Sequence, residues 1–353
     1  METLLSYKFK VCVSFDKRQV FLIMTRINYI DNMKAMGITL VVLGHAVWLN
    51  EDVYTLIYSF HMPLFFFLSG YLASSKREVK QSLIKLFQRL ILPFTFFFLI
   101  SYLFWLPLNI LGDGQASKMQ WFDPLSRLVT SKADSFHING VLWFFPCLIV
   151  ISLAQIVFFS ALKPIYSFVI TSGVLVLMLL SNELISERWF WSIDSAVIGM
   201  FFYQLGVLVK RVNLLSYAVF NNEFKTYLIL LFTIPIFCYL ALLNGRVDIR
   251  ELKFGVFPLL FPLIACLGIF ILFLISKKLK PRPIFQWLAI SSIVIFPLHL
   301  IVFRFLHKIE VKIIPNIWYL FDFLPYLNTC IAICCLVFVF RFLKSKTPRL
   351  IGL

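Results

Sequence analysis

Long apolar runs recur along the whole chain, separated by short segments that carry the charged residues, Pro, Gly and Asn. A run of about twenty apolar residues is long enough for a helix to cross the hydrocarbon core of a bilayer. The pattern predicts an all-α fold, a polytopic integral membrane helical bundle of about ten transmembrane helices. The predicted spans are 30–49, 54–74, 90–110, 139–160, 164–182, 190–209, 225–243, 254–275, 284–306 and 323–343.

The composition excludes an ordinary soluble domain. Hydrophobic residues make up 61% of the 353 positions and charged residues 14%, whereas about a quarter of the residues of a soluble domain are charged. The net charge of +16 would suggest nucleic acid in a soluble protein, but no zinc-ligand spacing or RNA-binding signature accompanies it. We therefore expect no nucleic-acid partner and no metal. The seven cysteines lie mostly inside apolar runs and predict buried thiols.

Lysine and arginine gather in alternate loops, as in segments 76–89 and 277–282. Acidic residues gather in the other loops, as at 51–52 and 248–251. Because loops rich in Lys and Arg stay in the cytoplasm, this pattern predicts that both the N- and C-termini are cytoplasmic. Nine or eleven spans would mix the two kinds of loop.

The chain divides into three parts. Residues 1–25 form an N-terminal extension that lacks the continuous apolar core of a signal peptide, and one hypothesis is that translation starts at Met24. Residues 26–345 are expected to form a single membrane domain, and residues 346–353 a short cytoplasmic tail.

The first two predicted spans hold a set of polar residues. Lys34 and His45 are eleven residues apart, which at about 100° per residue puts them on one helix face about 16 Å apart. Asp31 shares that face, and His61 in the second span lies at a depth similar to that of His45. Such side chains usually face a bundle interior or a water-filled cavity. Two imidazoles at one depth suit proton transfer, because histidine titrates near neutral pH.

Structural roles remain open for single residues of this hairpin. An isolated intramembrane histidine such as His61 can serve as a hydrogen-bonding group between helices. Pro63 can kink its helix, and Ser69 with Gly70 can let two helices approach closely. Both histidines together with the charged residues of the first span nevertheless favour a functional site.

The stretch from Arg26 to His45, followed by Phe60 to Leu72, resembles the start of the acyltransferase-3 family, especially its fucose 4-O-acetylase-like branch. That family has a basic residue, a ten-residue gap and a histidine, which Lys34 and His45 match, with Lys where many members have Arg. Weaker likenesses occur at 85–93, 142–145, 202–206 and 291–299.

The resemblance implies an acyl-CoA-dependent O-acyltransferase. Members of the family move an acyl group, usually acetyl, from cytoplasmic acyl-coenzyme A to a sugar hydroxyl of a lipid-linked or exported glycan. The implied partners are therefore acetyl-CoA as the donor co-substrate, a glycan acceptor and membrane lipid, with no permanently bound cofactor. A multi-pass place in the cell inner (cytoplasmic) membrane and a role in polysaccharide biosynthesis follow from the same resemblance, whereas the acceptor sugar and the oligomeric state do not.

Three tasks of that reaction can be assigned to residues. His45 is the predicted general base on the acceptor hydroxyl, and His61 is expected to orient His45 or the acceptor. Cationic side chains near the inner face suit the phosphates of the donor. The catalytic candidates are His45, His61, Asp31 and Lys34, the donor-binding candidates are Arg26, Lys34, Arg89 and Lys85, and the substrate-binding candidates are Ser69, Trp143 and His299.

Other interpretations accompany the weaker candidates. Arg89 can be a positive-inside anchor, Trp143 a core or interfacial aromatic residue, and His299 a structural residue. Arg304 can extend its side chain outward or meet an acid, and Asp194 is its candidate partner.

Two other classes of function remain open. Ten spans with buried polar residues also suit a transporter or flippase of a lipid-linked glycan. A structural assembly subunit is a third alternative, but it gives the polar stripe of the first span no purpose. The sequence contains no G-x-S-x-G, H-E-x-x-H, P-loop or G-x-G-x-x-G pattern.

Overall fold

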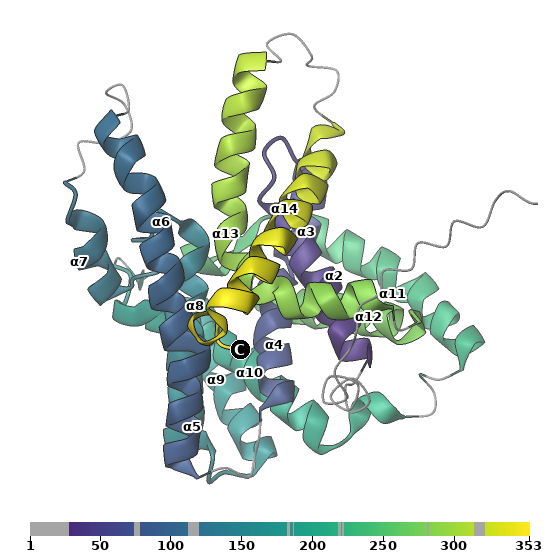
Figure 1. Cartoon of the computed structure of the whole chain (residues 1–353). Helices are drawn as coiled ribbons and strands as arrows, with labels where there is room; N and C mark the ends of the chain where they lie inside the picture. The colour runs from purple at the N-terminus through teal and green to yellow at the C-terminus, as the bar shows by residue number, and fades with distance from the viewer. Residues whose placement is uncertain are drawn as a thin grey trace, which may run out of the picture.

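The computed structural model (Figure 1) describes residues 28–73, 78–111, 120–181, 184–185, 187–217, 220, 222–280, 282–313 and 322–353. Its first half contains α2 (Asn28–Gly44), α3 (Glu51–Tyr58), α4 (His61–Leu72), α5 (Val79–Leu86), the π-helical turn η1 (Phe87–Ile91), α6 (Leu92–Leu111), α7 (Asp123–Thr130), the 3-10 turn η2 (Gly140–Trp143), α8 (Phe144–Ala154), the π-helical turn η3 (Gln155–Phe159) and α9 (Pro164–Ser181).

The second half is helical as well, apart from one small β-hairpin. It contains η5 (Phe190–Ser192), α10 (Ile193–Arg211), η6 (Leu214–Ser216), α11 (Glu223–Asn244), β1 (Val247–Asp248), η8 (Ile249–Glu251), β2 (Lys253–Phe254), η9 (Pro258–Leu260), α12 (Phe261–Lys278), α13 (Pro283–Ile313), α14 (Leu324–Lys346) and η11 (Pro348–Ile351). The two strands pair antiparallel, with Val247 opposite Phe254.

Nine helical segments within the described ranges are long and apolar enough to cross a membrane. They coincide with nine of the ten predicted spans, and α2, with 17 residues, occupies the first predicted span. The prediction of an all-α polytopic membrane protein is therefore confirmed.

The second predicted span is broken into α3 and α4. The backbone leaves helical geometry at Phe60, where φ is −145°, and α4 restarts at His61. Pro63 lies in the first turn of α4, where its missing N–H costs no hydrogen bond, and it could not donate to the carbonyl of Ser59 in a continuous helix. The proline thus explains a break just before it.

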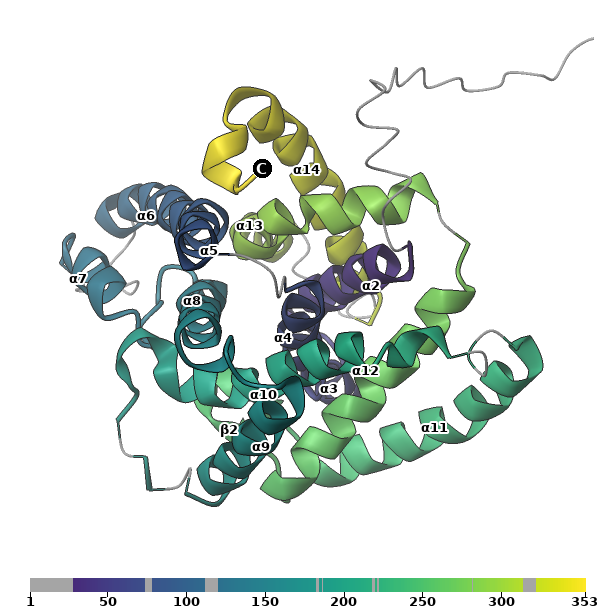
Figure 2. The same ribbon diagram turned by 90° about the horizontal axis from the view of Figure 1, so that it is seen from below.

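A second proline lies inside α13. Pro297 cannot donate to the carbonyl four residues earlier, and the ribbon of α13 changes direction between its two ends (Figures 1 and 2). Internal proline is a usual cause of such kinks. The bend matters for the site, because His299 follows two residues after Pro297.

The interior of the bundle is built around α2, α4 and α10. In Figure 2, α2 and α4 lie among α10, α12 and α13. α4 and α10 touch through their backbones: a Cβ on Gly70 would collide with the carbonyl oxygen of Tyr203, and one on Gly206 with the carbonyl oxygen of Phe67. Small residues allow this approach between membrane helices.

Apolar side chains cover the periphery as well as the core. α11 exposes Phe224, Leu231 and Tyr239, and α9 exposes Leu177 and Leu180. In a membrane protein these side chains face lipid, so their exposure needs no further partner.

The segment between α11 and α12, residues 245–257, is the hairpin that carries β1 and β2, and we call it the α11–α12 hairpin. The side chain of Asn244 fixes its ends, because Nδ2 donates to the Phe254 carbonyl at 2.9 Å and Oδ1 accepts from the Phe257 N–H at 2.9 Å. Gly255 has φ +81° and lies against Asn244, where a side chain would find neither room nor a relaxed backbone. The hairpin is therefore held in one position at the end of α11.

Candidate active site

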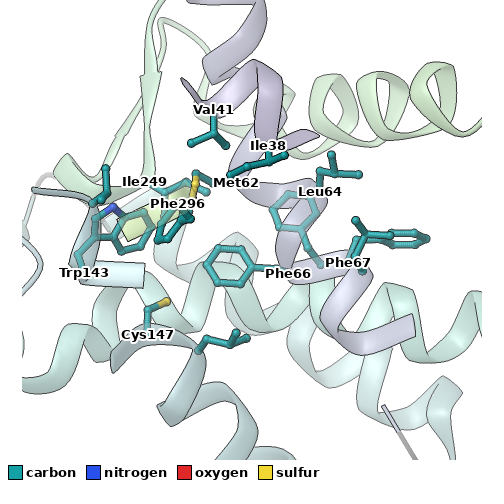
Figure 3. Packing of buried hydrophobic residues seen from close by; sticks show 14 of the residues in the cluster. Ile38, Val41, Met62, Leu64, Phe66, Phe67, Trp143, Cys147, Ile249 and Phe296 are labelled. Carbon is teal, nitrogen blue, oxygen red and sulfur yellow. The ribbon is translucent and has the colours of Figure 1, made fainter. Parts of the chain in front are cut away.

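A pocket with an empty volume of about 390 Å³, including open solvent, lies where the C-terminal end of α2 meets α3, α4, η2, β1, η8 and α13. We call it the histidine pocket. Its lining residues are His45, Tyr58, His61, Met62, Val141, Trp143, Asp248, Ile249, Arg250 and Phe296. Figure 3 shows Met62, Trp143, Ile249 and Phe296 gathered side by side, so one wall is apolar and aromatic.

Each histidine of this region directs one ring nitrogen to a backbone carbonyl. Nδ1 of His45 lies 2.9 Å from the Val41 carbonyl oxygen, and Nδ1 of His61 lies 2.9 Å from that of Ile57. Nδ1 of His299 lies 2.7 Å from the Phe296 carbonyl oxygen. A carbonyl oxygen only accepts, so Nδ1 donates and, in each neutral ring, Nε2 holds the basic lone pair.

The three imidazoles and Tyr58 form one cluster. The ring centroids of His45 and His299 are 5.0 Å apart, and those of Tyr58 and His61 are 4.6 Å apart. The Tyr58 hydroxyl lies 3.3 Å from Nε2 of His45, a long hydrogen bond. Nε2 of His299 is buried and has no hydrogen-bond partner among the described residues.

His45 also ends a helix. α2 ends at Gly44. In a continuing helix the Val41 carbonyl would accept a hydrogen bond from the backbone N–H of His45, but here it accepts one from the His45 imidazole. The C-terminal end of a helix carries partial negative charge and favours a cation nearby. The helix end therefore favours a proton on the His45 ring, whereas the nearby guanidinium of Arg250 opposes it.

The α11–α12 hairpin contributes the charged wall of the pocket. Oδ1 of Asp248 accepts from the N–H groups of Arg250 and Glu251 at 2.9 and 3.3 Å. Burial raises the pKa of the Asp248 carboxyl, and the nearby Glu251 charge raises it further. Nε of Arg250 donates to the Ala133 carbonyl at 3.1 Å. The pocket thus places a carboxyl and a guanidinium opposite the histidines.

Four of the predicted residues come together here. His45, His61 and Trp143 line the histidine pocket, and His299 stands beside His45. Sequence reasoning missed Tyr58, Asp248 and Arg250. The one available signal was a run of alternating charges at 246–253, and nothing in its spacing connects that loop with the first two spans.

Other predicted residues lie elsewhere. Asp31 is buried in the first turn of α2 and Lys34 is half-buried one turn on, toward the end of α2 opposite His45. Ser69 donates to the Phe65 carbonyl of its own helix at 2.7 Å and does not line the pocket.

The remaining donor-binding candidates are dispersed. Lys85 lies in α5 and Arg89 is exposed in η1, beside Gly352 at the C-terminal turn. Arg26 lies outside the described residues.

The suggested pairing of Arg304 with Asp194 is wrong. Asp194 is fully buried and accepts from Nε of Arg188 at 2.6 Å, forming an ion pair with that residue. Arg304 reaches the carbonyl of His137 instead, at 3.4 Å. The sequence did not reveal the Arg188–Asp194 ion pair, because Arg188 lies before α10 and outside the predicted span that holds Asp194.

Fold and site together define a multi-pass α-helical membrane protein with a buried, histidine-lined pocket. Within the described ranges, no group of three His, Cys, Asp or Glu side chains is arranged to hold a metal ion. The chain belongs to the acyltransferase-3 family, since the model of that family, described as an acyltransferase domain, matches residues 27–342. No curated protein and no solved structure matches the chain.

Proposed function

We propose that this membrane acyltransferase transfers an acetyl group from cytoplasmic acetyl-CoA to a sugar hydroxyl of a lipid-linked or exported glycan. His45 is the general base of this proposal. The observation that carries it is the position of His45 Nε2, which is left basic by the Nδ1 contact to Val41 and lies at the wall of the pocket. The likeness of the first hairpin to the fucose 4-O-acetylase-like branch supports a sugar as acceptor.

The base works on a hydroxyl that enters the pocket. When the acceptor oxygen attacks the thioester carbonyl, its proton passes to His45 Nε2. The Tyr58 hydroxyl, at 3.3 Å from that nitrogen, holds the ring until the acceptor replaces it. His61 and His299 keep the surroundings polar, and Trp143 offers the sugar an aromatic face.

In this proposal the donor phosphates bind near the start of α2, and the acceptor hydroxyl binds near its end. Lys34 lies near the start of the helix and His45 directly after its end, about 16 Å away along the axis. Lys34, Lys85 and Arg89 belong to the side that loop charge assigns to the cytoplasm, where donor phosphates would arrive. The pantetheine arm, which is long and slim, would carry the thioester toward His45. In this proposal the protein resides in the bacterial inner membrane and serves polysaccharide biosynthesis.

The test compares the full chain with a His45→Gln variant, both purified in detergent. Each is incubated with radiolabelled acetyl-CoA and a panel of polyprenyl-diphosphate-linked sugars, and labelled ester is measured. Loss of a general base should lower the rate about 10²- to 10⁴-fold. The control is His307→Gln, a histidine outside the pocket that lies beside Glu310. Equal labelling by the wild type and His45→Gln would overturn the assignment.

A further inference from the structure

We propose that Arg250 is a catalytic residue of this acyl transfer, whose guanidinium stabilises the oxyanion formed when the acceptor attacks the thioester. The inference rests on the proposed function. It concerns a hairpin residue, far in sequence from the polar stripe of α2.

Arg250 enters the histidine pocket from the side of η8, whereas His45 enters from the end of α2. Its Nε is engaged by the Ala133 carbonyl at 3.1 Å, which fixes the plane of the guanidinium. Among the described residues, none accepts a hydrogen bond from its two terminal nitrogens. These donors are therefore available to a ligand in the pocket, and a planar guanidinium presents them as a rigid fork.

Gly140 provides the room for this side chain. A Cβ at position 140 would lie 3.0 Å from Nη1 of Arg250, tighter than ordinary van der Waals contact. Gly140 begins η2, which also brings Val141 and Trp143 to the pocket wall. The backbone of η2 and the guanidinium are thus fitted to each other.

A buried hydrogen-bond network binds the backbone carbonyls of Ile249 and Arg250. Arg188, paired with Asp194, donates through Nη1 to the Arg250 carbonyl and through Nη2 to Ser195 Oγ at 2.9 Å. Ser195 Oγ in turn donates to the Ile249 carbonyl at 3.1 Å. The Ile249 carbonyl is therefore bound directly to α10, and the Arg250 carbonyl is connected to α10 through Arg188. Arg188, Asp194 and Ser195 are positioning residues, since none of them lines the pocket.

Arg250 acts during the addition of the acceptor to the thioester. The acceptor oxygen forms a bond to the thioester carbonyl carbon, its proton moves to His45 Nε2, and the π electrons move onto the carbonyl oxygen. That oxygen carries the negative charge that the guanidinium of Arg250 meets. The carbonyl then reforms, the carbon–sulfur bond breaks, and the coenzyme A thiolate takes the proton from His45. Preorganised donors at such an oxygen are often the largest single contribution to catalysis.

Arg250→Gln in the full chain tests the proposal, in the same labelling assay as His45→Gln. We expect kcat to fall about 10²- to 10³-fold while KM for acetyl-CoA and for the acceptor stays within about threefold. The matched control is Lys253→Gln, an exposed cation of the same hairpin that pairs with Glu251, and it should leave kcat unchanged. An unchanged kcat in Arg250→Gln, or a defect confined to the acceptor KM, would overturn the proposal.

Gly140→Ala provides a second variant that keeps every charge. The added methyl displaces Nη1 of Arg250 by a few tenths of an ångström, and a misplacement of about 1 Å can cost about 10²-fold in rate. We therefore expect kcat to fall about threefold with an unchanged thermal unfolding midpoint. If Arg250→Gln does not fold, Gly140→Ala decides, and normal kcat in that variant counts against Arg250.

The two proposals fail in different ways. If His45→Gln retains full activity, the general-base assignment of the proposed function falls. If His45→Gln is inactive and folded Arg250→Gln is fully active, only the role of Arg250 falls.

Discussion

At the scale of single residues, backbone carbonyls decide what the histidines can do. The carbonyls of Val41, Ile57 and Phe296 each engage an Nδ1, so each neutral ring presents its lone pair at Nε2. Sequence spacing predicted that Lys34 and His45 share a helix face, but a tautomer depends on which group meets the ring. The carbonyls that His45 and His61 meet are determined by where α2 and α3 end, and the sequence does not show those positions.

The buried Arg188–Asp194 pair should contribute to stability as well as to the position of Arg250. Asp194→Asn leaves the Arg188 guanidinium, whose side chain is only 12% exposed, without its carboxylate. Breaking a buried ion pair from one side costs about 3–5 kcal/mol. Thermal unfolding in detergent should show a clearly lower midpoint for Asp194→Asn.

Glu187→Gln is the control for that measurement. Glu187 is 88% exposed and lies 3.9 Å from Lys132. Exposed pairs contribute about 0–1 kcal/mol, so this variant should unfold almost like the wild type. Similar midpoints for Asp194→Asn and Glu187→Gln would refute a stabilising role for the buried pair.

At the scale of elements, hydropathy located the spans but not their interruptions. The break between α3 and α4 falls at Phe60, in a run with neither Pro nor Gly at the break itself. Pro63 pointed to a kink in this span, yet the α3–α4 break also shapes the pocket. It places Tyr58, the last residue of α3, beside His61, the first residue of α4.

The backbone contact between α4 and α10 gives an element-scale prediction. Gly206→Ala would drive a methyl into the carbonyl of Phe67 and the N–H of Tyr71. Overpacking of this kind costs about 1–3 kcal/mol or more, so the thermal unfolding midpoint should drop.

Gly173→Ala is the matched control, because Gly173 lies inside α9 with no atom within 4 Å of the added Cβ. Replacing a glycine inside a helix by alanine should stabilise by about 0.5–1 kcal/mol. The two substitutions should therefore shift the midpoint in opposite directions. A drop of the same size in both would show that the α4–α10 contact is not the cause.

At the scale of the whole molecule, the fold was predictable and the pocket was only partly so. Apolar runs specify spans directly, since a bilayer demands their length. The pocket draws its walls from the end of α2 and from six other elements. Its histidines lie in predicted spans and could be recognised as buried polar residues, but Arg250 lies in a loop, where a charged residue is ordinary. Only tertiary packing brings that loop to His45.

The orientation of the whole bundle can be measured from two exposed lysines. Lys80 follows the second predicted span, and Lys253 follows the seventh, in the α11–α12 hairpin. Loop charge places Lys80 in the cytoplasm and Lys253 outside. In a cysteine-free background, Lys253→Cys in intact cells should react with a membrane-impermeant maleimide, whereas Lys80→Cys should react only after permeabilisation. The reverse pattern would invert the topology.

The glycine contact between α4 and α10 also determines which parts of the pocket can move. Backbone atoms that meet directly leave no side chains between them to rearrange, so we expect α4 and α10 to move together. This pair of helices carries His61 on α4 and, through Ser195 on α10, the turn of Arg250. We therefore expect the backbones of His61 and Arg250 to keep their separation, so that an opening that admits a substrate occurs elsewhere in the pocket wall.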